Sequence, residues 1–149
     1  MSALKTRITD DMKSAMKAGD KGGLKAIRMI LQAVKQREID ERIELDDGQI
    51  LTVIQKMVKQ RLDSISQFSA ADRQDLVKIE QAELAIINNY MPPQLSESEL
   101  QTAVDKAIAD TGANSMADIG RLMGLLKNQL QGKADMGKVS SLIRSKLSP

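Results

Sequence analysis

The chain has 149 residues, 42% of them hydrophobic, and its 22 Lys and Arg against 20 Asp and Glu give a net charge of +2. This length predicts one domain, or two small lobes, with an ordinary apolar core. Cysteine and histidine are absent, which excludes disulfides, zinc-thiolate sites and Ser-His or Cys-His catalysis. Phe68 and Tyr90 are the only aromatic residues, so base stacking on single-stranded nucleic acid is disfavoured.

Segments for membrane insertion or export, and motifs for nucleotide or metal binding, are missing from the sequence. No apolar run approaches the roughly 20 residues of a membrane span, and the N-terminal pattern is not that of a signal peptide. We therefore expect a cytoplasmic protein that does not enter a membrane. No P-loop, dinucleotide fingerprint or acidic metal loop is present, so we predict no catalytic residue, no metal and no cofactor.

Apolar spacing predicts two helices in the first 45 residues. Ser2 can cap the first, and Gly19 can end it. The second starts near Asp20 and runs on towards Leu45, with apolar residues at alternating spacings of three and four. Its cations form a line at seven-residue intervals, comprising Lys21, Arg28, Lys35 and Arg42. Such a line suits a phosphate backbone and equally an ordinary solvated helix face.

Two more helices are predicted before the prolines at 92–93. A turn at 46–48 precedes the third helix, whose expected apolar face comprises Leu51, Ile54, Met57, Val58, Leu62, Ile65 and Phe68. This helix ends near 70–71, and Asp72 begins the fourth, which is expected to bury Leu76, Ile79, Ile86 and Tyr90. The fourth must stop before the prolines, because a residue that precedes proline is pushed out of helical conformation.

Polar residues on the third and fourth helices are expected to form ion pairs with one another. The third carries Lys56, Lys59, Gln60, Arg61 and Ser64, and the fourth carries Arg73, Glu80 and Glu83. Salt bridges between adjacent antiparallel helices explain the set, and we assign it no catalytic role.

The double proline predicts a boundary between domains 1–91 and 92–149. Just after it, Ser96 and Glu99 form the pattern of a capping box, with Leu95 and Leu100 as a hydrophobic staple. The helix that begins there ends at Gly112. The expected fold is all-α, with a larger N-terminal lobe of about four helices and a smaller C-terminal lobe of three.

The last two helices carry the most specific pattern in the chain. Ser115 can cap the first of them with Asp118, Gly132 can end it in a left-handed conformation, and Asp135 can cap the second. Four residues fall on one stripe beside the apolar face, namely Gly120, Gly124, Lys127 and Gln131. Bare backbone there permits close approach, either by another helix of this protein or by a ligand or RNA backbone.

Charge is distributed unevenly along the chain. Residues 1–37 hold nine Lys and Arg against three Asp, and residues 38–47 hold six acids against one Arg. From Ser115 onwards there are six cations and two acids. Lys133 and Lys138 flank a predicted helix start, which favours an anion unless Asp135 already occupies the position as the cap.

Many residues match, in order, a known family over nearly the whole chain. These are Lys59-Gln60-Arg61, Ser64-Ile65, Phe68, Arg73, Leu76, Glu80, Glu83-Leu84, Tyr90-Met91-Pro92, Gln94-Leu95-Ser96, Gly112-Ala113, Asp118-Ile119-Gly120, Met123-Gly124, Gly132-Lys133-Ala134-Asp135 and Val139. The sequence thereby resembles the GatB/YqeY family. The resemblance implies an all-helical protein that is similar to the tail of the GatB subunit of tRNA-dependent amidotransferases, a tail that contacts the outer corner of tRNA. The amidotransferase chemistry lies in other domains of that enzyme.

The resulting hypothesis is a non-catalytic module that binds tRNA and does not read DNA sequence. Its expected phosphate-binding residues are Arg121, Lys127, Lys133, Lys138 and Arg144, and its close-approach glycines are Gly120, Gly124 and Gly132. One alternative is an adaptor that docks on an amidotransferase or an aminoacyl-tRNA synthetase. Another is an accessory carbon-nitrogen ligase or amidase-like activity with glutamine as amido donor.

Overall fold

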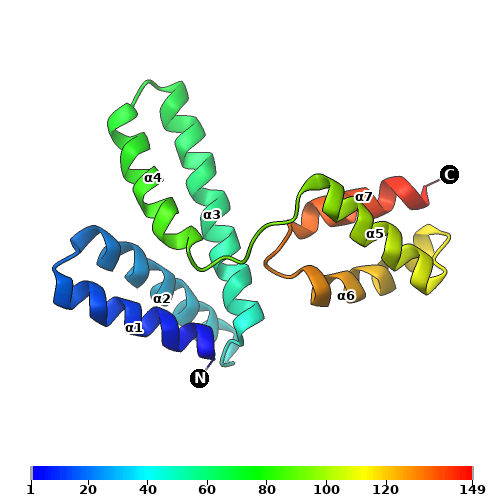
Figure 1. Ribbon diagram of the computed structural model, residues 1–149, viewed down its shortest axis with the longest axis horizontal. Coiled ribbons are helices and arrows are strands. Elements are labelled where there is room, and N and C mark those ends of the chain that lie inside the picture. The colour runs from blue at the N-terminus through cyan, green and yellow to red at the C-terminus, as the bar shows by residue number, and fades with distance from the viewer. Residues whose placement is uncertain (1, 149) are drawn as a thin grey trace. The chain divides into compact units, whose positions relative to one another are not determined.

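The computed structural model describes residues 2–148, and these contain seven α-helices, one short 3₁₀ helix and no strand. The prediction of an all-α fold is confirmed. The chain forms two compact units, Met1–Met91 and Pro92–Pro149. The first holds four α-helices and the second holds three, as expected (Figure 1).

Helices α1 (Ala3–Ala18) and α2 (Lys21–Glu41) form an antiparallel pair whose ends are set by local chemistry. The Ser2 side chain accepts a hydrogen bond from the first turn of α1. Gly19 ends α1 with φ +69°, a conformation that glycine adopts without steric cost. Asp20 then caps α2, so the sequence located this turn correctly.

Helix α2 stops at Glu41 rather than near Leu45, which corrects the expectation. Arg42 takes a left-handed conformation with φ 56° and breaks the helix. Glu38 holds the chain that follows, because its carboxylate accepts from the Leu45 amide at 2.9 Å and from Lys5 Nζ at 2.8 Å. The hydrogen bond from Lys5, reinforced by that from the amide, lowers the pKa of Glu38.

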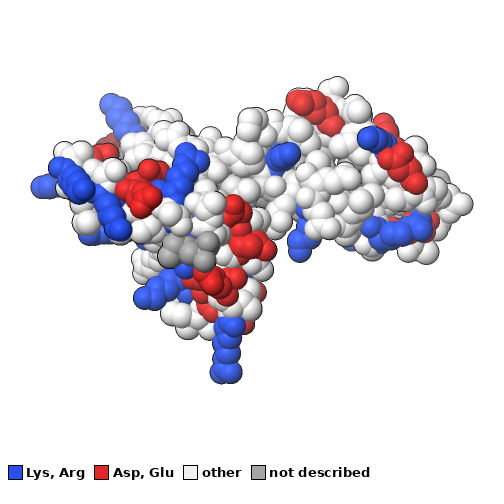
Figure 2. Space-filling view, turned by 60° about the horizontal axis from the view of Figure 1, so that its bottom comes forward, with Lys and Arg blue, Asp and Glu red and all other residues white. Residues whose placement is uncertain are grey.

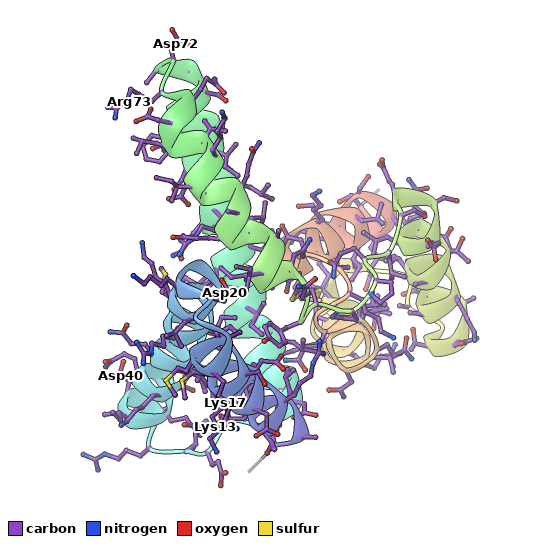
Figure 3. All side chains as sticks on the ribbon, turned by 60° about the vertical axis from the view of Figure 1, so that its left-hand side comes forward. Lys13, Lys17, Asp20, Asp40, Asp72 and Arg73 are labelled. Atoms are coloured by element: carbon purple, nitrogen blue, oxygen red, sulfur yellow. The ribbon has the colours of Figure 1, made fainter. Side chains whose placement is uncertain are left out.

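Helices α3 (Asp47–Ala70) and α4 (Gln74–Asn88) form a long hairpin. Residues 46–48 are not a free turn, since Asp46 caps α3 in a capping box with Gln49. Helix α4 begins two residues later than expected, because Asp72 takes a left-handed φ of 56°. Figure 3 shows Asp72 and Arg73 at the tip of this hairpin, away from α1 and α2.

The core of the first unit lies where all four helices meet. It contains Ile8, Ala15, Ile27, Ile30, Val34, Leu45, Ile50, Ile54, Met57, Ile87 and Tyr90. Beyond α1 and α2 the hairpin of α3 and α4 stands alone (Figure 1). Ile79 on α4 is 51% exposed, so the expectation that it is buried is wrong, and Leu62 on the expected apolar face of α3 is also 51% exposed.

In the second unit, helices α5 (Glu97–Thr111), α6 (Ile119–Leu130) and α7 (Met136–Leu147) surround a separate core. Its buried residues are Leu100, Val104, Ala107, Ala113, Leu122, Leu126, Leu130, Ala134, Val139, Ile143 and Leu147. The capping box at Ser96 is present, and Gly112 ends α5 with φ +68°.

Within residues 2–148, no helix combines the length and the apolar character that crossing a bilayer requires.

Candidate nucleic-acid interface

The turn between α6 and α7 is fixed by hydrogen bonds from the segment that precedes α5. Gln94 Nε2 donates to the Gly132 carbonyl at 2.7 Å, and the Leu95 amide donates to the Lys133 carbonyl at 2.9 Å. Gly132 is buried and has φ +79°, as its predicted left-handed role requires. The backbone that presents the Lys133 side chain is therefore held in place by two hydrogen bonds from one segment.

Three of the five predicted cations lie at or near this turn. Lys127 is in the last turn of α6, Lys133 is in the connection, and Lys138 is in the first turn of α7. All three side chains are exposed, and none forms an ion pair with another described residue. They can approach an anion without first breaking an internal contact.

The N-terminus of α7 is already occupied by a carboxylate. Asp135 caps the helix and accepts from the Gly137 amide at 2.8 Å. A Cβ on Gly137 would lie 3.1 Å from the Asp135 carboxylate, so the glycine gives that carboxylate room. The sequence left either an anion or the Asp135 side chain as the partner of this helix start, and the structure shows the Asp135 cap. Any phosphate at this turn must therefore be held by lysine side chains.

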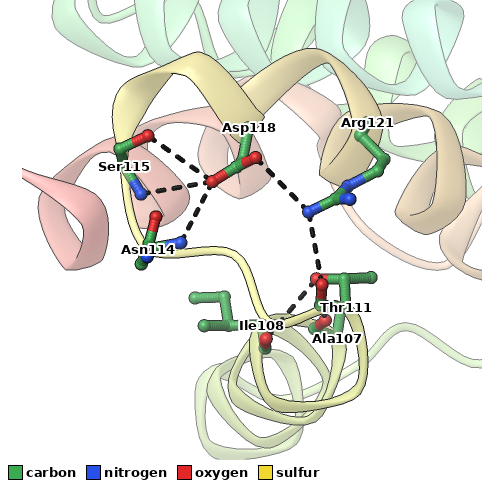
Figure 4. A network of polar contacts seen from close by, with 7 residues as sticks. All are labelled: Ala107, Ile108, Thr111, Asn114, Ser115, Asp118 and Arg121. Carbon is green, nitrogen blue, oxygen red and sulfur yellow. Dashed lines mark hydrogen bonds and ion pairs between the residues drawn. The ribbon is translucent and has the colours of Figure 1, made fainter.

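Arg121 lies at the other end of α6 and takes part in a polar network (Figure 4). Its guanidinium donates to Asp118 Oδ1 at 3.3 Å and to the Thr111 carbonyl at 3.2 Å. Asp118 also accepts from the amides of Asn114 and Ser115. These backbone hydrogen bonds, that from Asn114 first, lower the pKa of Asp118. Arg121 thus helps to hold the connection between α5 and α6.

Arg144 lies in the last turn of α7, at the opposite end of that helix from Lys138. Its side chain is exposed. The structure therefore does not gather all five predicted cations: Lys127, Lys133 and Lys138 lie around the turn, whereas Arg121 and Arg144 lie towards the far ends of α6 and α7.

The glycine stripe on α6 is open. A Cβ built on Gly120 or Gly124 would meet no heavy atom within 4 Å. Within the second unit no helix packs across the stripe, which does not support the interpretation that another helix of this protein covers it. The outer face of α6 leaves bare backbone beside Lys127 available to a partner.

In the first unit, the expected ion pairs between α3 and α4 are present. Arg61 Nε lies 3.0 Å from Glu83 Oε2 and 3.4 Å from Glu80 Oε2, and Lys25 Nζ lies 3.5 Å from Glu83 Oε1. Glu83 is buried between these cations, so its charge is compensated. Arg73 instead pairs with Asp75 beside it on α4.

A pocket of about 490 Å³ in the first unit was not expected from the sequence. Its polar wall includes Arg7, Asp11 and Tyr90. The Tyr90 hydroxyl donates to Asp11 at 2.6 Å, and the Arg7 guanidinium lies 4.8 Å from the ring centroid. The signal in the sequence that points to this pocket is a lone tyrosine at the end of an amphipathic helix, a pattern that by itself predicts only a core residue.

A comparison with protein families settles the relationship of this chain. The model of the YqeY family, described as Yqey-like protein, matches residues 5–147. The chain belongs to the YqeY-like family. The resemblance to the GatB/YqeY family is therefore confirmed as far as membership is concerned.

Curated relatives of the chain are fungal proteins named "Altered inheritance of mitochondria protein 41, mitochondrial". The protein of Pyrenophora tritici-repentis is 31% identical, covering 86% of this chain and 71% of its own length. That of Vanderwaltozyma polyspora is 32% identical, covering 93% and 79% respectively. That of Lachancea thermotolerans is 36% identical over 69% of this chain, which spans only 57% of the relative.

The names of these relatives correct the expected location. All three are named as mitochondrial proteins, and this points to mitochondria rather than the cytoplasm. The expectation of a cytoplasmic protein rested on the absence of a targeting pattern and is wrong.

Proposed function

We propose that this protein is a non-catalytic RNA-binding module that binds tRNA at the connection between α6 and α7. The observation that carries the proposal is the set of exposed, unpaired lysines Lys127, Lys133 and Lys138 around a turn whose backbone is clamped by Gln94 and Leu95. A rigid backbone lowers the entropy that ordering the site would cost on binding. Lysines supply phosphate contacts, which position RNA without reading its bases.

The described surface also favours recognition of shape over sequence. The two aromatic residues of the chain belong to the first unit, where Tyr90 is buried and Phe68 is half-buried. Stacking platforms for splayed bases are therefore missing from the proposed surface. Folded RNA such as tRNA presents a continuous phosphate backbone that does not need them.

The proposal is tested by titrating the full chain into labelled tRNA over a series of salt concentrations. Each phosphate contact is expected to contribute about 0.7–0.9 to the slope of log affinity against log salt. These three lysines therefore contribute about −2 to −3 to the slope. A chain that does not bind tRNA at low salt, or that binds with no salt dependence, contradicts the proposal.

The second candidate is a protein adaptor that docks on an amidotransferase or synthetase. It is favoured by the open stripe at Gly120 and Gly124 and by Met116, which is 45% exposed. An apolar interface of this kind depends little on salt. Association with a purified partner that persists at high salt, together with weak RNA binding, would favour the adaptor.

A further inference from the structure

The hairpin of α1 and α2 carries a second group of exposed cations, distant in sequence from the turn between α6 and α7. Lys13 and Lys17 are one helical turn apart on α1, and Figure 3 shows them next to each other. Residues four apart on a helix have Cβ atoms about 5–6 Å from each other. The two ammonium groups therefore project from one face of α1.

Helix α2 adds two cations at the same end of the hairpin. Arg28 NH2 lies 3.5 Å from the sulfur of Met16, which places the guanidinium beside α1. Lys21 is the first residue of α2 and follows the short turn at the same end of the hairpin. We call these four cations the hairpin surface: Lys13, Lys17, Lys21 and Arg28.

The cations of the hairpin surface outnumber the acids beside them, which are Asp10, Asp11 and Asp20. None of its four residues forms an ion pair with any residue in the described part of the chain, and all four side chains are exposed. Of these acids, Asp11 accepts from Tyr90 and Asp20 caps α2, and the side chains of Asp10 and Asp20 are exposed. Figure 2 shows several Lys and Arg side chains over this end of the unit, with acidic side chains among them.

Acidic residues are concentrated instead at the opposite end of the hairpin. Glu38 pairs with Lys5 near the start of α1, and Glu41 pairs with Arg37. The excess of cations in residues 1–37 and of acids in 38–47 is thus separated in space along the helices. This separation gives the hairpin surface a positive field towards solvent.

We propose that the hairpin surface is a second contact for the phosphate backbone of RNA, an inference that rests on the proposed function. RNA fits better than a protein partner, since the buried centres of protein interfaces are depleted in lysine. With no aromatic residue in α1 or α2, the surface contacts backbone and not bases. Two contact surfaces in one chain reinforce each other, because binding at one raises the effective concentration at the other.

The test compares two double variants of the full chain, both titrated into labelled tRNA. Lys13→Glu with Lys17→Glu alters the hairpin surface. Lys56→Glu with Lys78→Glu makes the same change in net charge at exposed positions on α3 and α4. Circular dichroism checks that both variants remain folded.

The inference predicts that the Lys13 and Lys17 variant loses about two phosphate contacts and the control loses none. Between about 50 and 200 mM salt, the affinity of the wild type should then fall about 7- to 12-fold further than that of the variant. Equal salt slopes for the wild type and the Lys13 and Lys17 variant, or an equal effect of both variants, would overturn the inference. A wild-type chain that does not bind tRNA overturns the proposed function as well. Binding that depends on Lys133 and Lys138 but not on Lys13 and Lys17 overturns only the inference about the hairpin surface.

Discussion

The hydroxyl of Tyr90 donates a hydrogen bond of 2.6 Å to Oδ2 of Asp11, which joins the end of α4 to α1. Arg7, one turn before Asp11, stacks over the same ring. Tyr90 is followed directly by the residues that connect the two units. The contact thus fixes the point at which the chain leaves the first unit.

Tyr90 is expected to titrate well above its ordinary pKa of about 10. Burial, then the hydrogen bond to the Asp11 carboxylate, raises the pKa because both disfavour tyrosinate. The raised pKa means that this contact stabilises the fold below pH 10 and that its contribution is lost as pH rises above that value. Since Tyr90 is the single tyrosine and tryptophan is absent, near-ultraviolet absorbance follows it alone. A midpoint near 10 in the native protein would contradict the contact.

Asp118 is expected to stabilise the connection between α5 and α6 at neutral pH and to lose that effect in acid. Its pKa is lowered, so the contribution is complete above the ordinary carboxyl range and disappears as pH falls through the lowered pKa. Asp118→Asn should increase amide hydrogen exchange at Asn114 and Ser115, whose N–H groups donate to the carboxylate. Unchanged protection of both amides in the variant would show that these hydrogen bonds are not formed in solution.

Gly124→Ala is expected to stabilise the protein by about 0.5–1 kcal/mol, because the position is helical and open to solvent. The matched control is Gly132→Ala, which should destabilise it by about 1–2 kcal/mol because φ is +79° there. Chemical denaturation measures both changes. Destabilisation by Gly124→Ala would show that another segment packs on α6 after all.

Limited proteolysis is expected to cut first between the two units, in the segment around 91–93, or near Gly112. The reason is that each unit has a core of its own, and Pro92 and Pro93 belong to neither apolar cluster. Mass spectrometry of the first fragments identifies the cut. A first cleavage inside α3 or α4 would contradict the proposed domain boundary.

Helix ends that depend on local chemistry could be predicted from the sequence. Two helices begin at serine caps, Ser2 and Ser96, and two helices end at left-handed glycines, Gly19 and Gly112. The end of α2 could not be predicted, because apolar spacing continues to Leu45 while a tertiary contact from Glu38 shapes the turn.

At the candidate site too, local features could be predicted from the sequence and tertiary contacts could not. Lys133, Lys138 and the Asp135 cap were found from spacing, since a helix start is a local feature. The contacts of Arg121 and the pocket around Tyr90 depend on residues distant in sequence. The open face at Gly120 and Gly124 likewise depends on which helices pack together, and periodicity alone does not specify that.

The most direct test of the proposed function is the tRNA affinity of Lys133→Glu with Lys138→Glu, measured beside the Lys56→Glu and Lys78→Glu control. Both altered lysines of the first variant are exposed, so its helical content and melting temperature should stay close to those of the wild type. This variant is expected to bind tRNA more weakly, with a salt slope that is shallower by about 1.4–1.8, corresponding to two lost phosphate contacts. Wild-type affinity and slope in the folded Lys133 and Lys138 variant would contradict the proposed function.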